Sequence, residues 1–235
     1  MAKIILSAVV CLAMFGSMAF ADSLCPEPKG RFPHPEQCDA YYECVDGVAE
    51  EKLCPDGLVF NPRAKAAGEC TYSPFSTCKE RTRLQPANGT EQCPRQFGFY
   101  PLGDPTKCGV YHNCAHGEAT LTKCPEGLAF NVDSYQCDWP DLVKDCNAEA
   151  FLGFTCPPPK EDDANVKVDV TPEGELRYYP HPNTCKKYFV CVNGHPRLYN
   201  CGRYLAFNPE TKLCDFYRNI PDCYARLKDK KERRA

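Results

Sequence analysis

The chain has 235 residues, 19 cysteines and a formal net charge of −3 at pH 7. So small a charge excludes the basic bias of a nucleic-acid-binding protein and fits a neutral ligand or a protein partner. The cysteines indicate disulfides, metal sites or redox centres, and the compartment of the chain helps to choose among them.

Residues 1–21 have the layout of a secretory signal peptide. Lys3 precedes an uncharged apolar stretch, and the small residues Ala19 and Ala21 form an A-F-A cleavage site. We expect cleavage after Ala21 and a secreted product; a membrane anchor is the alternative, which the A-F-A site disfavours. No later stretch approaches the roughly 20 apolar residues of a membrane span, so the mature chain is expected to be soluble, with no membrane partner.

Cleavage would remove Lys3 and Cys11, which leaves 18 cysteines and a net charge of −4 (−3 with one lysine less). An even number of cysteines in an exported chain predicts disulfides, because the extracellular space is oxidising. It also argues against a cytosolic zinc or redox protein.

The 18 cysteines fall into three sets of six with matched spacing. The numbers of residues between successive cysteines are 12-5-9-15-7, 14-5-9-12-8 and 28-5-9-12-8. The central 5-9 spacing recurs while the first gap varies, as in tandem copies of one module. We predict modules at 22–78, 93–146 and 156–223, linkers at 79–92 and 147–155, and a basic tail at 224–235.

Each module is too small to fold robustly on apolar burial alone. Three disulfides at about 2–4 kcal/mol each would supply what the core lacks. The predicted fold class is therefore small, disulfide-rich and mainly β, with three tandem cystine-stapled hairpin modules. The short polar linkers are expected to be semi-flexible, and the basic tail to be a solvated end. The first linker carries the sequon Asn88-Gly89-Thr90, an acceptor for N-glycosylation in a secreted chain.

A hairpin is predicted at the same place in every module, over residues 38–54, 108–124 and 185–201. Two strand-like runs flank a two-residue turn, and both turn residues of such a hairpin need positive φ, which favours Asp-Gly and Asn-Gly. The turns are Asp46-Gly47, His116-Gly117 and Asn193-Gly194.

One tyrosine stands three residues after the first cysteine of each hairpin. Side chains alternate between the two faces of a strand, so these tyrosines are predicted to face away from the cystines. Each ring either covers the second face of a thin sheet or serves as a platform for a ligand, and the spacing does not decide between these interpretations. The three are Tyr41, Tyr111 and Tyr188.

Other matched positions lie further along each module. An aromatic residue follows the fifth cysteine: Tyr72, Trp139 and Phe216. A Leu-X-Phe-Asn run follows the fourth cysteine, and we expect its phenylalanine to belong to the core: Phe60, Phe130 and Phe207. The asparagine of that run is expected to cap a turn rather than to contact a ligand: Asn61, Asn131 and Asn208.

Metal binding and catalysis are not supported. Zinc favours Cys-X2-Cys pairs, which are absent. His112 and His116 are four residues apart, but a hairpin does not bring such a pair together. There is no Gly-X-Ser-X-Gly, no His-Glu-X-X-His and no carboxylate pair that recurs between the modules. We predict no metal, no cofactor and no enzymatic activity.

The cysteine order, the C-X2-Y-X2-C core, the C-P-X-G-L-X-F-N run and the C-D-aromatic ending resemble the peritrophin-A-type, or type-2, chitin-binding domain. Three such domains after a signal peptide resemble the obstructor family of arthropod cuticular proteins. This resemblance covers roughly residues 25–223. It implies non-catalytic binding of chitin in an extracellular matrix such as cuticle, with chitin and other matrix proteins as partners.

Chitin is uncharged, and its sugar rings present apolar faces that aromatic side chains can cover. Hydroxyl and amide groups can bond its polar substituents. The three hairpin tyrosines, the aromatic residues after the fifth cysteine and the three asparagines are therefore the candidate chitin-binding residues. A cysteine-rich protease inhibitor, with residues 157–184 as its loop, or a protein-interaction module is the alternative.

The resemblance also implies a disulfide order, whereas sequence alone leaves 15 pairings per module. The family joins the first cysteine to the third, the second to the sixth and the fourth to the fifth. This order gives Cys25–Cys44, Cys38–Cys78, Cys54–Cys70, Cys93–Cys114, Cys108–Cys146, Cys124–Cys137, Cys156–Cys191, Cys185–Cys223 and Cys201–Cys214.

Modules 1 and 3 depart from the family pattern. Module 1 has C-T-Y in place of C-D-aromatic and a longer gap before Cys70. Module 3 lacks the Pro-X-Gly after Cys201 and carries an acidic insert at Glu161–Asp163. We expect these two modules to bind less well, or to use their altered loops for other contacts.

Overall fold

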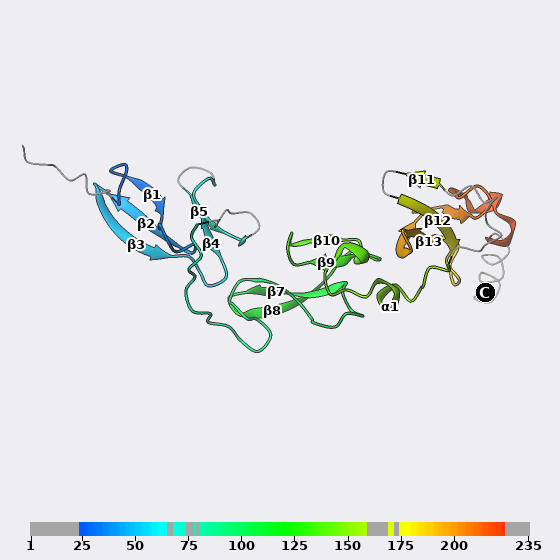
Figure 1. The fold of residues 1–235 in the computed structure, drawn as a ribbon, viewed down its shortest axis with the longest axis horizontal. Coiled ribbons are helices and arrows are strands. Elements are labelled where there is room, and N and C mark those ends of the chain that lie inside the picture. Colours follow the sequence, from blue (N-terminus) through cyan, green and yellow to red (C-terminus); the bar gives the residue numbers. More distant parts are fainter. Residues whose placement is uncertain are drawn as a thin grey trace, which may run out of the picture.

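The computed structural model describes residues 24–64, 68–73, 78, 80–158, 169–171 and 174–223. The expected signal peptide (1–21), the acidic insert at Glu161–Asp163 and the basic tail (224–235) lie outside these residues. The described chain consists mainly of short antiparallel strands, which form three modules in a row (Figure 1). No helix in these ranges is long and apolar enough to cross a membrane.

The larger sheet of each module is built around the predicted hairpin. Modules 1 and 2 have the strand orders β1-β2-β3 and β6-β7-β8, and module 3 adds one strand to give β11-β12-β13-β14. The bounds are β1 Gly30–Pro33, β2 Ala40–Val45, β3 Val48–Leu53, β6 Gly98–Pro101, β7 Val110–Ala115, β8 Glu118–Lys123, β11 Asp169–Thr171, β12 Gly174–Pro180, β13 Lys187–Val192 and β14 His195–Asn200.

The three predicted hairpins are confirmed. Both central residues of every turn have positive φ, from 49° at Asn193 to 86° at Gly194. This is the conformation of a type I′ turn, whose twist matches that of the flanking strands. His116-Gly117 adopts it too, although its sequence signal is the weakest of the three.

A smaller two-stranded sheet completes each module. Its strands are β4 Val59–Asn61 with β5 Glu69–Thr71, β9 Ala129–Asn131 with β10 Gln136–Asp138, and β15 Leu205–Asn208 with β16 Leu213–Phe216. The phenylalanine of each first strand is buried, which confirms the core prediction: Phe60, Phe130 and Phe207 are 0%, 3% and 4% exposed.

Eight of the nine implied disulfides are present among the described residues: Cys25–Cys44, Cys38–Cys78, Cys54–Cys70, Cys93–Cys114, Cys108–Cys146, Cys124–Cys137, Cys156–Cys191 and Cys201–Cys214. Cys185 packs against a buried cluster of Ala206, Ile220 and Cys223. The ninth disulfide, Cys185–Cys223, stays a prediction.

The segment that follows module 1 is ordered, so the expectation of a semi-flexible linker was wrong for residues 80–92. Arg81 is 8% exposed, and its Nη2 donates to the Phe60 carbonyl oxygen over 3.1 Å. The carbonyl of Arg83 accepts from the Cys38 N–H over 2.9 Å. These polar groups satisfy backbone carbonyls and N–H groups of module 1, a role that composition does not reveal.

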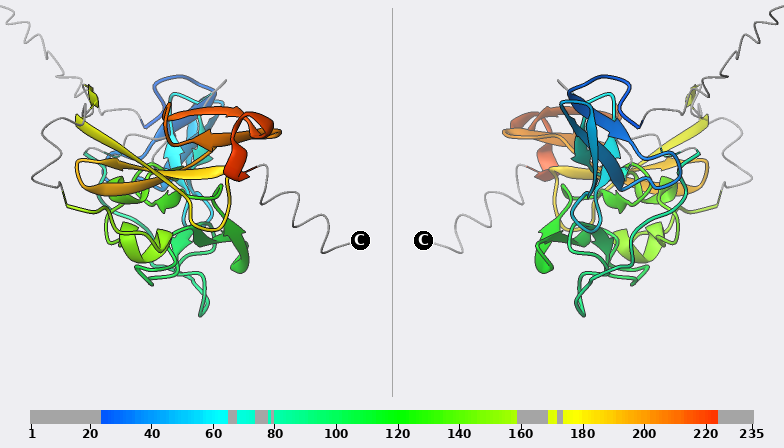
Figure 2. Two further views of the ribbon diagram at one scale, coloured as in Figure 1. Left: turned by 90° about the vertical axis from the view of Figure 1, so that its right-hand side faces the viewer. Right: turned by 90° about the vertical axis from the view of Figure 1, so that its left-hand side faces the viewer.

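Residues 147–155 also form a structured bridge rather than a tether. They contain the helix α1 (Ala148–Leu152), which the Asn147 side chain caps and which ends at Gly153 with φ 64°. Beyond it, Phe154 stacks on Phe189 of module 3, with the ring centroids 4.2 Å apart and the planes 3° apart. Viewed along the long axis, module 2 (green) lies to one side of modules 1 and 3 (Figure 2).

Candidate functional site

The three matched tyrosines each stack on the buried phenylalanine of the smaller sheet. The ring centroids lie 4.7, 4.0 and 4.3 Å apart, and the planes differ by 17°, 18° and 10°. Strand alternation places each tyrosine on the face opposite the third cysteine of its module. One face of each ring thus covers the core, and the tyrosine remains partly exposed. The pairs are Tyr41–Phe60, Tyr111–Phe130 and Tyr188–Phe207.

In module 1 the surroundings of the tyrosine are charged. The guanidinium of Arg31 lies 5.6 Å from the centre of the Tyr41 ring and is paired with Glu43 over 3.1 Å. On the next strand of the same sheet, Lys52 is ion-paired with Glu50. These charges suit a neutral ligand poorly, since binding would desolvate them.

In module 3 the tyrosine lies inside a column of rings. Tyr188 has Phe207 at 4.3 Å and Tyr199 at 5.5 Å, and Trp139 of module 2 stacks on Tyr199 at 4.9 Å. Burial raises the pKa of Tyr188, and the neighbouring tyrosine hydroxyls add to the shift. This ring is therefore mainly part of the packing.

Module 2 presents the most suitable surface for an uncharged ligand. Across its hairpin, Tyr111 pairs with Thr122 and Asn113 pairs with Thr120, so the four side chains share one face. Phe99 meets the Tyr111 ring edge-on, with centroids 6.1 Å apart and planes at 71°. We name Phe99, Tyr111, Asn113, Thr120 and Thr122 the neutral patch, because it joins aromatic rings to hydroxyl and amide groups without a formal charge.

Two of the three aromatic residues after the fifth cysteine lie at a module boundary. Tyr72 of module 1 contacts Phe99 of module 2 at 4.8 Å, and Trp139 of module 2 contacts Tyr199 of module 3. Phe216 differs: it is 49% exposed, with the Arg218 guanidinium 5.5 Å from its ring centre. Two of these three candidates therefore join modules.

The three asparagines act as turn caps, as expected. The side-chain oxygens of Asn61, Asn131 and Asn208 accept from the backbone N–H two residues further on, over 3.0, 3.0 and 2.9 Å. Each asparagine is partly exposed. Direct contact of their amide groups with a ligand stays a prediction.

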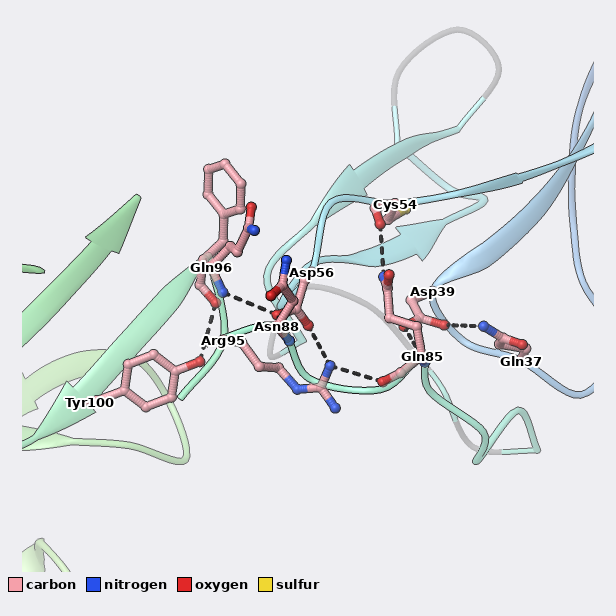
Figure 3. Close-up of polar contacts among 10 residues, drawn as sticks. Gln37, Asp39, Cys54, Asp56, Gln85, Asn88, Arg95, Gln96 and Tyr100 are labelled. Atoms are coloured by element: carbon pink, nitrogen blue, oxygen red, sulfur yellow. Dashed lines mark hydrogen bonds and ion pairs between the residues drawn. The ribbon is translucent and has the colours of Figure 1, made fainter. Parts of the chain in front are cut away.

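A buried carboxylate fixes module 1 to module 2 (Figure 3). Asp56 is 7% exposed and accepts from Arg95 Nη1 over 2.6 Å, from the Asn88 N–H over 2.8 Å and from the Gln96 N–H over 3.2 Å. Burial on its own would raise the pKa of Asp56, but these hydrogen bonds and the Arg95 charge together lower it below the ordinary 3.8. The side chain of Asn88 is exposed, which is compatible with glycosylation.

A second carboxylate fixes module 2 to module 3. Asp141 accepts from Arg197 Nε and Nη2 over 2.9 and 2.7 Å, and the Arg197 guanidinium also lies 5.3 Å from the Trp139 ring centre. Both side chains of the ion pair are largely buried, at 7% and 13% exposed. Lys187 forms a further ion pair with Glu126 across the same boundary.

Two glycines allow the close approach of modules. A Cβ on Gly57 would lie 1.9 Å from the Phe97 carbonyl oxygen, and one on Gly127 would lie 2.9 Å from the Leu198 Cβ. Sequence reasoning missed this role. One sequence signal of this role was available: the first two modules have Pro-X-Gly after the fourth cysteine, whereas module 3, the last of the three, has Tyr204 in place of the glycine.

No cluster of three or more metal-ligating side chains occurs in the ranges that the structure describes. The tyrosine positions of the modules offer aromatic, partly exposed surfaces. Such surfaces suit binding of an extended neutral ligand.

Comparison with known proteins agrees with this geometry. The profile of the chitin-binding peritrophin-A domain matches residues 25–78, 93–146 and 172–223. The chain is 71% identical, over its whole length, to Protein obstructor-E of Drosophila melanogaster, and the match covers 95% of that protein. It is 31% identical to Peritrophin-1 of Anopheles gambiae, over 57% of this chain and 82% of the relative. Similarity to Probable chitinase 10 of D. melanogaster covers 51% of this chain but 6% of that protein, at 28% identity.

Proposed function

The chain belongs to the family of the chitin-binding peritrophin-A domain, and from this premise we propose that it is a secreted structural protein that binds and organises chitin in an extracellular matrix such as cuticle. The observation that supports a specific site is the neutral patch of module 2. Its rings can cover the apolar face of a sugar, and its amide and hydroxyl groups can bond N-acetyl and hydroxyl groups.

The three modules contribute unequally in this proposal. Module 2 supplies the main contact, because Tyr111 is partly exposed among uncharged neighbours. Module 1 contributes less, since Arg31 and Glu43 would have to be desolvated beside Tyr41. In module 3 the Tyr188 ring is flanked by Phe207 and Tyr199, so its contribution is the smallest.

The protein acts without catalysis in this proposal. The chitinase relative matches over only a small share of its own length, so similarity to it carries no argument for hydrolysis. Three shallow sites on one chain gain affinity for a repeating polymer through effective concentration, on the order of 10²–10⁴. That gain suits a protein that links chitin chains to each other or to other matrix proteins.

Retention of the disulfide-intact protein on chitin beads tests the site. Tyr111→Ala should weaken retention by about 1–3 kcal/mol, a value borrowed from aromatic stacking on bases as a loose analogue. Tyr111→Phe keeps the stack on Phe130 and should lose only the hydroxyl contribution. Leu121→Ala is the matched control, because Leu121 lies on the neighbouring strand β8, is 56% exposed and points to the opposite face of the sheet.

Thermal melting of each variant separates loss of binding from loss of folding. If Tyr111→Ala, Asn113→Ala and the Leu121→Ala control are retained equally by chitin, the neutral patch is not the site. Release of sugar from chitin, or inhibition of a protease without chitin binding, would contradict the function itself.

A further inference from the structure

The same three positions meet the following module at both boundaries. They are the acidic residue two positions after the fourth cysteine, the glycine that follows it, and the aromatic residue two positions after the fifth cysteine. We name this set the docking face. It consists of Asp56, Gly57 and Tyr72 in module 1, and of Glu126, Gly127 and Trp139 in module 2.

In module 3 the docking face is exposed and its chemistry is changed. Arg203 replaces the acid, Tyr204 replaces the glycine and Phe216 holds the aromatic position. Tyr204 and Phe216 are 64% and 49% exposed. In addition, Arg218 stands four residues after the fifth cysteine, where module 2 has the buried Asp141.

The opposite end of the chain has a surface that complements these changes. The edge strand β14 of module 3 receives module 2, and its counterpart in module 1 is the edge strand β3. Counted back from the fourth cysteine, Glu50 of β3 takes the place of Arg197, and Lys52 takes the place of Tyr199. The Glu50 side chain is 70% exposed.

Compared with the boundary between modules 2 and 3, the proposed contact between module 3 and the β3 edge of module 1 has both partners of each side-chain pair replaced. The ion pair of Asp141 with Arg197 would become one of Arg218 with Glu50, with the two charges exchanged. The ring that stacks on Tyr199 would become Phe216 beside Lys52, which is a cation–π pair. Complementarity is thus kept although all four residues differ.

We propose that the docking face of module 3 binds the β3 edge of module 1 in a second copy of the chain, so that copies associate head to tail. Modules 1 and 3 lie at opposite ends of the long axis (Figure 1), so the contact joins different surfaces and leaves both outer ends open. An exposed edge strand is a ready partner for such a contact.

Tyr204 sets the strength of this contact. It occupies the place of Gly127, against which Leu198 packs closely at the internal boundary. A second copy therefore approaches less closely than module 3 approaches module 2. The contact is consequently weaker than the internal boundaries and is reversible with dilution.

Sedimentation velocity of the full, disulfide-intact chain over a range of concentrations tests the proposal. The native chain should form dimers and longer species that dissociate in high salt. Arg218→Glu and Glu50→Arg should each weaken association by up to about fivefold, the size expected from losing a surface ion pair, and the double variant should restore it. Arg63→Glu, a charge reversal at another exposed arginine, is the control.

An equal mixture of the two single variants gives a sharper result. In the mixture, the module 3 docking face of each variant is complementary only to the β3 edge of the other variant. The two proteins should therefore alternate and restore association to the native extent, although each variant alone associates weakly. The proposal is overturned if the native chain stays monomeric at all concentrations, or if either single variant associates like the control. It is also overturned if Phe216→Ala lowers chitin retention and leaves association unchanged, because the face would then be a sugar platform.

Discussion

Replacing Asp56 by alanine should release module 1 from module 2 without unfolding either module. The change removes the acceptor of the Asn88 and Gln96 N–H groups and of the Arg95 guanidinium. A neutral hydrogen bond contributes about 0.5–1.5 kcal/mol and one to a charged group about 1.5–3 kcal/mol. Arg95 keeps the Gln85 carbonyl as a second acceptor and is partly solvated, so we expect a loss of about 2–4 kcal/mol at this boundary.

Hydrogen exchange at the Asn88 and Gln96 amides measures the loss directly. Exchange through local opening should accelerate roughly 30- to 900-fold, because each 1.36 kcal/mol is a factor of ten. The disulfides keep each module folded, so exchange in the hairpin strands should change little. Glu118→Ala removes an exposed acid and should leave both amides unchanged. If the Asn88 and Gln96 amides of the Asp56→Ala protein exchange as slowly as in the native chain, the Asp56 carboxylate does not hold modules 1 and 2 together.

Three further outcomes are expected. Acid should open the same boundary. Because folding lowers the pKa of Asp56, the stabilisation that its carboxylate gives to the boundary is complete above the ordinary pKa of 3.8 and is lost as the pH falls through the pKa of the folded state. The chemical shift of the Asn88 amide, followed from pH 6 to pH 2, measures this loss. Thiol titration of the denatured, unreduced secreted protein should read near zero, and two thiols per chain would exclude a Cys185–Cys223 bond. Retention on chitin should persist in molar NaCl because the neutral patch carries no charge to screen; elution by modest salt would assign binding to charged residues.

The sequence was sufficient to predict the features that depend on residues close together in the chain. Asp46-Gly47 and Asn193-Gly194 predicted the hairpins because positive φ is a property of single residues. The matched spacing of the cysteines predicted three modules, and alternation placed Tyr41 on the face opposite Cys44. Each of these inferences uses residues that are close in the chain.

Features that depend on contacts between distant segments could not be predicted in the same way. Residues 80–92 have the composition of a linker, yet Arg81 reaches the core of module 1 because carbonyl groups there need a donor. Trp139 was assigned to a ligand because its partner, Tyr199, lies 60 positions away in a different module. Only comparison of the repeats, with glycine at 57 and 127 but tyrosine at 204, carries a signal of these boundaries.

The contacts at the two module boundaries fix the spacing of the three modules, and this spacing affects how strongly the whole chain binds chitin. Flexible linkers would let each module search for its own sugar, whereas a fixed spacing raises effective concentration only where the polymer offers sites at that spacing. Asp56 is remote from the neutral patch in sequence and contacts none of its side chains through the hydrogen bonds described above. Asp56→Ala therefore changes the spacing and loosens the contact of Tyr72 with Phe99 at the margin of the patch, while Tyr111 keeps its stack on Phe130. Tyr111→Ala changes the contact with the ligand while the spacing remains. We expect both to lower retention on chitin, and retention that is unchanged in Asp56→Ala would mean that the modules bind independently.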